Sequence, residues 1–358
     1  MKRSFILSIL LILIGTSSRL WAQEVSKETL QALYQQIDDA IEQSPQYVAK
    51  RLRQIADTRR MLSNETSLEK EFPLAEQLFA LYKPYKNDSA LYFADLCISL
   101  ADSLHRKDMM GLYLSEKAHQ CSNAGMYVES LNLLKKVDER TLNQEGLTKY
   151  YAAWMHVCGE IGSYSQQPYI QNNYYGMQDK YRDSVLSVAE KGSEEFLHLK
   201  MDVLCARKQF QEALDISESW LSKVSDGSHE SAYASFYRSM VYGHLGNGDQ
   251  LRYWLGKSAL DDIKCAVNDQ ASLFMLAERL CEDGDYERAH RYVQFCEASN
   301  LAFSPQLRTY QVRYVANVME SLYQHSQARY SRLLTIACVG AVLLLIVLGC
   351  LLFARRKR

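Results

Sequence analysis

The chain is poor in the residues that make tight turns, with 16 glycines and 5 prolines among 358 residues. Sheet proteins need such turns after every few residues, so strand-rich architectures are disfavoured and long helices are favoured. The length is sufficient to bury a sizeable core, either as one solenoid or as two globular domains. We therefore predict an all-α fold.

The chain also lacks an excess of charge, since its 41 Lys and Arg and 42 Asp and Glu residues give a formal net charge of -1. A nucleic-acid-binding surface normally carries a basic excess that neutralises phosphates. We therefore predict that this part of the protein binds no nucleic acid.

Motifs of catalysis are missing as well. There is no nucleophile elbow, phosphate loop or dinucleotide fingerprint. His229-Glu230 opens the pattern of a zinc-protease helix, but Tyr233 stands where the second histidine is needed. Acidic pairs such as Glu194-Glu195 and Asp261-Asp262 are interpreted as helix starts or solvated faces. We predict no enzyme activity, no metal and no cofactor.

Cysteines are present but do not form a metal or redox motif. Seven lie before the C-terminal apolar segment, and Cys338 and Cys350 lie within it. The seven are Cys97, Cys121, Cys158, Cys205, Cys265, Cys281 and Cys296. Each is part of an apolar helical pattern, so we interpret them as small buried residues. If a disulfide forms, Cys281 and Cys296 are the best candidate pair.

One long segment has no charge at all. Residues 333–353 are apolar or small, and 21 residues of helix span roughly 31 Å, which matches a hydrocarbon core of about 30 Å. We predict a transmembrane helix over 333–353. The tail 354–358 carries Arg355, Arg356, Lys357 and Arg358, and such a basic cluster stays on the cytoplasmic side.

The N-terminus has the pattern of a secretory signal peptide. Lys2 and Arg3 precede an apolar run that is too short to span a membrane, and Leu20-Trp21-Ala22 resembles a cleavage site. We expect residues 1–22 to be removed and the following domain to be exported. Together with the basic tail, this predicts a single-pass protein of the bacterial inner membrane with a periplasmic N-terminal domain and a cytoplasmic C-terminus.

The middle of the chain repeats a helix-turn-helix pattern. In LSEKAHQCSNAGMYVESLNLLKKV and again in FMLAERLCEDGDYERAHRYVQFCEA, a small residue, a turn glycine and an aromatic residue recur at similar offsets. The residues that we assign to repeat packing are Ala118, Gly125, Tyr127, Phe210, Ala213, Tyr242, Gly246, Ala277, Gly284, Tyr286 and Ala289. This pattern resembles the tetratricopeptide repeat, in which small residues let two antiparallel helices approach.

The spacing of the turns shows that the repeats are degenerate. We assign turns to Gly125, Gly162, Lys208, Gly246 and Gly284, which gives steps of 37, 46, 38 and 38 residues. The longest step contains a stretch rich in Tyr, Gln and Asn, which predicts an inserted loop over 163–181. We expect about five units over 106–303 that stack into one solenoid, because a single repeat cannot bury its own apolar face.

Helices are also predicted on both sides of the repeats. Residues 23–105 read as helical pairs, and Ser44-Pro45 is a typical helix start. Ser304-Pro305 repeats this signal and opens a juxtamembrane helix over 304–332. Apolar residues there keep helical spacing without glycine or proline, so one helix is expected to continue into the membrane. This helix is also a candidate surface for a homodimer.

Tyrosine is unusually frequent, with 24 residues. Four of them, Tyr164, Tyr169, Tyr174 and Tyr175, lie at or within the expected loop. Tyrosine offers an apolar ring and one polar group, so these four are candidates for contact with a peptide or a glycan. The alternative is a flexible loop with no binding role.

The whole arrangement resembles membrane-anchored tetratricopeptide regulators of Gram-negative bacteria. LYKPYKNDSALYFADLCISLADSL, residues 81–104, resembles the segment before the repeats in that family, where an Asp-Ser-Ala-Leu-x-Tyr core recurs; here Phe93 stands at its last position. In these relatives a cytoplasmic coiled coil and an effector domain follow the membrane helix. Nothing follows Arg358 here, so we expect that the effector half is missing from this sequence.

Two functions follow from these observations. The first is a non-enzymatic sensor or regulator whose periplasmic solenoid binds a protein, peptide or envelope ligand and passes the signal through the juxtamembrane helix. The second is a tethered scaffold for envelope assembly or glycan capture, in which the membrane helix is only an anchor.

Overall fold

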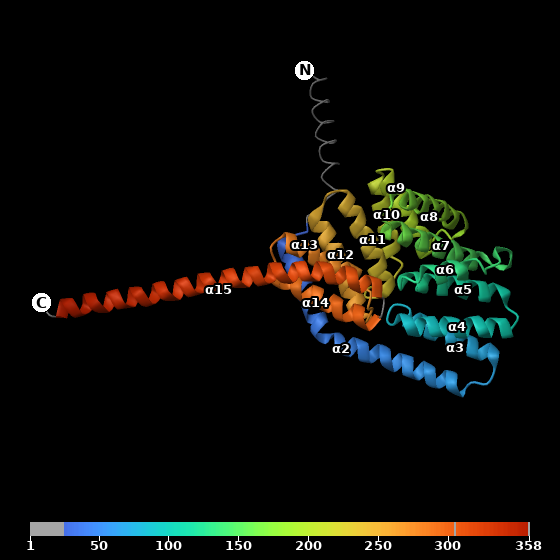
Figure 1. Ribbon diagram of the computed structural model, residues 1–358, viewed down its shortest axis with the longest axis horizontal. Coiled ribbons are helices and arrows are strands. Elements are labelled where there is room, and N and C mark those ends of the chain that lie inside the picture. The colour runs from blue at the N-terminus through green and yellow to red at the C-terminus, as the bar shows by residue number, and fades with distance from the viewer. Residues whose placement is uncertain (1–24, 304–305, 357–358) are drawn as a thin grey trace, which may run out of the picture. The chain divides into compact units, whose positions relative to one another are not determined.

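The computed structural model describes residues 25–303 and 306–356 and is all-α (Figure 1). The predicted signal peptide and Ser304-Pro305 lie outside the described residues. The first helices are α2 (Lys27–Asn64), α3 (Leu68–Tyr82), α4 (Asn87–Ser103), α5 (Lys107–Asn123), α6 (Tyr127–Leu134), α7 (Gln144–Tyr164) and α8 (Pro168–Val188), with a 3₁₀ turn at Glu139–Thr141. The remaining helices are α9 (Glu194–Ala206), α10 (Phe210–Leu221), α11 (His229–His244), α12 (Gly248–Lys264), α13 (Ala271–Glu282), α14 (Tyr286–Phe303) and α15 (Gln306–Arg356). The predicted helical-repeat fold class is confirmed, and the described ranges contain no strand.

The chain forms two compact units. Unit 1 contains residues 25–54 and 180–267, and unit 2 contains residues 55–179 and the described residues from Asn268 onward. The chain crosses from one unit to the other within α2, within α8 and between α12 and α13.

Six connections between successive helices have the same tight turn, in which one residue has a positive φ. At the α5–α6 turn Gly125 has φ 77°, its N–H donates to the Ser122 carbonyl, and the Met126 N–H donates to the Cys121 carbonyl, both at 2.9 Å. This is the Schellman motif, which pairs the last carbonyls of a helix while it reverses the chain. The residues with positive φ that carry this turn are His105, Gly125, Lys208, Gly246, Ala266 and Gly284.

Two of our turn and loop assignments were wrong. Gly162 lies within α7 and is not a turn, and the expected loop over 163–181 is mainly helix, because α8 begins at Pro168. Proline at the first helical position has the φ that a helix needs and lacks only an N–H that would have no partner there. The polar composition of this stretch reflects a helix with one buried side chain, Val185, rather than a loop.

The predicted helix start at Ser44-Pro45 was also wrong, because α2 continues through Pro45. An internal proline removes one helical hydrogen bond and opposes the helix by about 3 kcal/mol. Apolar residues that are buried on both sides of it, Ile37 before and Ile55 after, stabilise the continuous helix.

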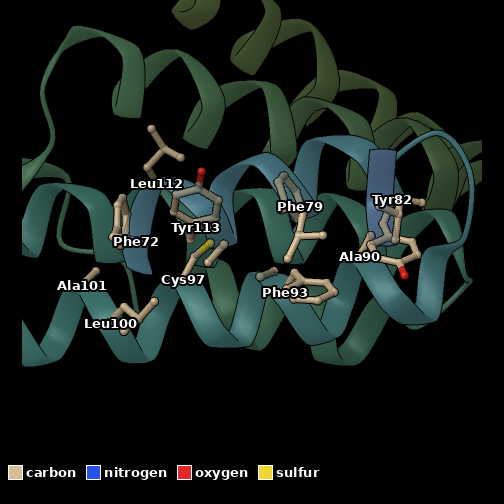
Figure 2. Packing of buried hydrophobic residues seen from close by; sticks show 14 residues of the cluster. Phe72, Phe79, Tyr82, Ala90, Phe93, Cys97, Leu100, Ala101, Leu112 and Tyr113 are labelled. Atoms are coloured by element: carbon tan, nitrogen blue, oxygen red, sulfur yellow. The ribbon is translucent and has the colours of Figure 1, made fainter. Parts of the chain in front are cut away.

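Unit 2 has an aromatic core between α3, α4 and α5 (Figure 2). The Tyr113 ring meets Phe72 and Phe79 edge to face, with centroid distances of 5.9 and 5.5 Å. Tyr82 stacks on Phe93 at 5.4 Å. Such pairs add to the stabilisation that burial itself provides.

The cysteines of the two units are free thiols. Cys97, Cys121, Cys158, Cys205 and Cys296 are buried. Burial raises the pKa of the Cys97 thiol to about 12, so it stays protonated and unreactive at neutral pH. The candidate pair Cys281–Cys296 is not bonded; instead, Cys296 Sγ donates to the Gln270 carbonyl at 3.7 Å.

The last helix, α15, has 51 residues without a break (Figure 1). Its start packs on α14, where Ala316 and Met319 are buried. The Tyr323 ring stacks on His290 at 4.4 Å, and His290 Nδ1 lies 3.0 Å from Glu320 Oε2. Farther along, the helix is long and apolar enough to cross a membrane, over the range Ala316–Val347.

The turn geometry gives a first prediction. Lys208 has φ 60° although it has a side chain, whereas Gly246 has φ 71° with no atom near its missing Cβ. We expect Lys208→Gly to raise the free energy of unfolding by about 1 kcal/mol and Gly246→Ala to lower it by about as much, because only glycine adopts this conformation freely. Urea unfolding of the full chain in detergent measures both. Equal effects of the two substitutions would contradict this explanation.

Close packing of α2 on α12 gives a second prediction. A Cβ on Gly256 would lie 2.8 Å from Leu33 Cδ2 and 3.5 Å from Ile37 Cδ1. We expect Gly256→Ala to lower the free energy of unfolding by about 1–3 kcal/mol, because the buried Leu33 side chain must leave its packed position. In a Leu33→Ala background the same change should cost clearly less. An equal cost in both backgrounds would show that this contact does not set the helix spacing.

Candidate functional site

The four tyrosines proposed for ligand contact do not form one patch. Tyr164 lies against Tyr127, with a centroid distance of 6.2 Å. Tyr175 covers Gly162, where a Cβ would lie 2.8 Å from the ring, and its hydroxyl is 3.4 Å from Ser163 Oγ. Tyr174 is half-buried, whereas Tyr169 is 85% exposed. Tyr164 and Tyr175 therefore pack helices together, and of the four only Tyr169 is largely open to solvent.

The residues assigned to repeat packing lie on the inner sides of helix pairs or at their turns. Ala118, Ala213, Ala277, Ala289 and Tyr242 are buried; Tyr127, Phe210 and Tyr286 are half-buried; Gly125, Gly246 and Gly284 have positive φ. They leave other faces of the same helices free for additional roles.

One such face in unit 1 combines aromatic rings and a carboxylate. His198, Tyr237 and Trp220 form a stack, with His198–Tyr237 centroids 4.8 Å apart and Tyr237–Trp220 centroids 6.2 Å apart. The plane of the Tyr233 ring is steeply inclined to the other three ring planes, at 90° to His198, 71° to Tyr237 and 72° to Trp220. Asp202 follows His198 by one helical turn. We call His198, Asp202, Trp220, Tyr233 and Tyr237 the aromatic–carboxylate face.

The repeat brings these residues together. His198 and Asp202 lie on α9, and Tyr233 and Tyr237 lie 35 residues later on α11, in each case four residues apart. Side chains four residues apart share one face of a helix. Helices α9 and α11 are in contact, and both pack on α10, which supplies Trp220.

His198 is held in its neutral form. Its side chain is buried, and burial lowers its pKa to about 4. Nδ1 lies 2.9 Å from the Glu194 carbonyl, one helical turn earlier, and donates to it. At neutral pH the ring is therefore uncharged and can stack on Tyr237 without introducing a positive charge into the face.

Asp202 is accessible to solvent, yet the surrounding protein excludes enough water to raise its pKa to about 6. Arg182 and His244 act against this shift. Within the described residues the carboxylate has neither a hydrogen bond nor an ion pair, so it is ready to accept one from outside.

The tyrosine hydroxyls complete the polar part of the face. The Tyr233 and Tyr237 hydroxyls are 3.4 Å apart. Burial raises the pKa of Tyr237 well above its ordinary value, and the charges of Asp202 and Glu194 act in the same direction. The Tyr237 phenol therefore stays protonated at neutral pH.

The sequence does carry a signal for this face. Two residues four positions apart, His198 and Asp202, are followed 35 residues later by Tyr233 and Tyr237, and the turn glycines do not reveal this spacing. Glu194-Glu195 does stand at a helix start, where Ser193 Oγ accepts a hydrogen bond from the Phe196 N–H.

The second acidic pair, Asp261-Asp262, was misinterpreted. Both residues are buried toward the end of α12 rather than solvated or at a helix start. Asp262 Oδ1 lies 2.9 Å from His229 Nδ1, and Asp261 Oδ2 accepts from Ser231 Oγ at 2.8 Å. These partners on α11 make the burial of two carboxylates tolerable.

Unit 2 contains a ladder of opposite charges that the sequence search also missed. Glu116 on α5 is buried between Lys83, 2.7 Å away and 33 residues earlier, and Lys149 on α7, 3.7 Å away. Lys83 follows the end of α3, so the ladder joins α3, α5 and α7, which are alternate helices of the chain. Because each charge in it has a protein partner, we interpret it as structural.

Comparison with known protein families gives one match. The family described as SusR N-terminal TPR domain matches residues 41–314. TPR denotes the tetratricopeptide repeat, in agreement with the helix pairs described above. The search of curated proteins gave no match.

The buried histidine gives a third prediction. The pKa of His198 is about 4 in the folded protein, against about 6.5 in an unfolded chain, so the unfolded state binds more protons between these values. The contribution of His198 to stability is therefore complete above pH 6.5 and decreases as the pH falls toward 4, by about 2 kcal/mol at pH 5.

His198→Phe keeps a ring but removes this proton site. We expect the unfolding free energy of the wild type to fall relative to that of His198→Phe as the pH is lowered from 7.5 to 5. The comparison cancels the opposite contribution of Asp202, whose raised pKa stabilises the fold at low pH. A difference independent of pH would contradict the buried neutral histidine.

Proposed function

Because the chain belongs to the family of SusR N-terminal TPR domains, which are helical-repeat regulators, we propose that it is a non-enzymatic, single-pass membrane sensor. In this proposal the repeat domain binds a protein, peptide or envelope ligand. The bound state is then passed along α15 to the other side of the membrane.

The observation that carries this proposal is the continuity of α15. The helix whose start packs on α14, through the stack of Tyr323 on His290, is the same helix that is long and apolar enough to span a membrane. A continuous helix transmits a shift or rotation of one end to the other, whereas a flexible linker does not. A helix that served only as an anchor would have no need of this continuity.

The proposed orientation follows from the two ends of the sequence. A signal peptide over 1–22 would export the repeat domain, and the cluster from Arg355 to Arg358 would remain in the cytoplasm. The protein would then lie in the bacterial inner membrane with its repeats in the periplasm. Labelling of cysteines introduced at either end, in intact and in opened cells, measures this orientation directly.

The sensor proposal gives a fourth prediction. Residues 327–335 of α15 are exposed, so an insertion after Gln327 leaves the contact with α14 in place. Seven glycine and serine residues inserted there should break the coupling. Transcripts whose levels change when the gene is deleted should then change to the same extent in this insertion variant. Seven alanine-rich helical residues at the same point turn the helix by only about 20° from its original register, and regulation should persist.

The matched insertions separate the two functions considered above. If both variants keep wild-type transcript levels, α15 is an anchor and the protein is a tethered scaffold. Membrane fractions probed for each variant control for its amount and insertion.

A further inference from the structure

The stretch of α15 between its contact with α14 and the apolar segment carries two arginines that the protein leaves unpaired. Arg329 and Arg332 are exposed, and neither makes a hydrogen bond or an ion pair within the described residues. Arg140, which is also exposed, shows the contrast, because its Nε lies 2.9 Å from Asp138 Oδ1. No acidic residue follows Glu320 in the sequence. The two arginines therefore have no neighbour of opposite charge on their own stretch of helix.

Both arginines lie on the side of α15 that is turned away from α14. They are three residues apart, which places them next to each other on one face of a helix. Tyr323, which stacks on His290 of α14, marks the opposite side, because Arg332 follows it by nine residues, or two and a half turns. Both guanidinium groups are consequently available to a partner outside the repeat domain.

The position of the two arginines along α15 matches the headgroup layer of a membrane. The uncharged segment begins at Leu333, so Arg332 and Arg329 precede it by about 1.5 and 6 Å of helix. The headgroup layer on each side of the hydrocarbon core is about 5–7 Å thick. Tyr330 lies at the same level and is 72% exposed, as is typical of an aromatic residue at a membrane interface. With residues 333–353 in the membrane, both arginines lie among the lipid phosphates.

We propose that Arg329 and Arg332 bind the phosphate group of an anionic lipid in the leaflet on the repeat side, which fixes the depth and rotation of α15. A guanidinium group presents its N–H donors in a planar fork that fits a phosphate. An anionic lipid fits better than a zwitterionic one, because its headgroup carries no cation that competes for the phosphate. In the proposed orientation the pair lies on the exported side, where basic residues are usually less frequent. This proposal rests on the membrane span of the sensor and adds the lipid partner of the same helix.

The test uses the full chain in lipid nanodiscs with a fluorescent reporter, Leu334→Trp. Leu334 is 60% exposed and lies just inside the apolar segment. Lipids with brominated acyl chains quench tryptophan on contact, and the chain without the reporter gives the background of its other tryptophans. Quenching by brominated phosphatidylglycerol and by brominated phosphatidylcholine, in mixed nanodiscs, gives the relative affinity of the two lipids beside the reporter. We expect phosphatidylglycerol to be preferred at least about 5-fold.

Three paired substitutions in the reporter chain locate the binding. Arg329→Gln with Arg332→Gln should reduce the preference to less than about 2-fold, because the charges are lost. Arg355→Gln with Arg356→Gln is the matched control, since it removes two charges at the far end of the apolar segment, and it should leave the preference unchanged. Arg329→Lys with Arg332→Lys keeps the charge but loses the planar fork, and it should give an intermediate value.

Four results would overturn the lipid site: equal affinity for both lipids; equal losses from the two glutamine pairs; full preference with the lysine pair, which would indicate attraction to surface charge alone; and loss of the preference when inorganic phosphate is added at constant ionic strength, which would assign the pair to a soluble anion. None of them bears on the insertions in α15. Absence of quenching by either lipid would instead overturn the membrane span, and the sensor function with it. The lipid site and the sensor function can therefore fail separately.

Discussion

Reversal of the chain at a single residue with positive φ is the constraint on which the rest of the structure depends. Each such turn ends one helix, pairs its last carbonyls and starts the next helix within about three residues. Successive helices consequently pack antiparallel, and every second helix presents an equivalent face. The aromatic–carboxylate face combines residues from matching positions of α9 and α11, which both pack on α10.

Burial then determines the chemistry of that face. The same exclusion of water keeps His198 uncharged and raises the pKa of Asp202 and of Tyr237. A neutral stack results on helices α9, α10 and α11, near a carboxylate that makes no hydrogen bond or ion pair within the described residues. The charge ladder of Lys83, Glu116 and Lys149 shows the opposite case, in which the protein supplies the partners itself.

Features that depend on residue size and apolar spacing could be predicted from the sequence. Small residues such as Ala118 and Ala277 mark positions where helices approach, and the uncharged run of 21 residues lies in a helix that is long and apolar enough to cross a membrane. Turns were harder, because His105, Lys208 and Ala266 adopt the same positive φ as the turn glycines, and their side chains give no sign of it. The prediction for Gly162 had the opposite error. We assigned this glycine to a turn, but its missing side chain makes room for the Tyr175 ring.

The candidate site could be predicted least. Tyrosine-rich sequence drew attention to residues 163–181, whereas the aromatic stack combines residues from three helices that only the repeat packing brings together. The buried pair Asp261-Asp262 was hidden for the same reason, since its partners lie on another helix. Local patterns identify helices well, but side-chain partners that are distant in sequence require the packed structure.

We propose that one unbroken helix joins the last repeat to the membrane. Hydrogen exchange of the full chain in nanodiscs tests it most directly, residue by residue along α15. The account predicts slow exchange throughout residues 316–347, including the exposed stretch between the contact with α14 and the apolar span. Rapid exchange confined to residues 324–332 would show a flexible joint at that point and would contradict the claim.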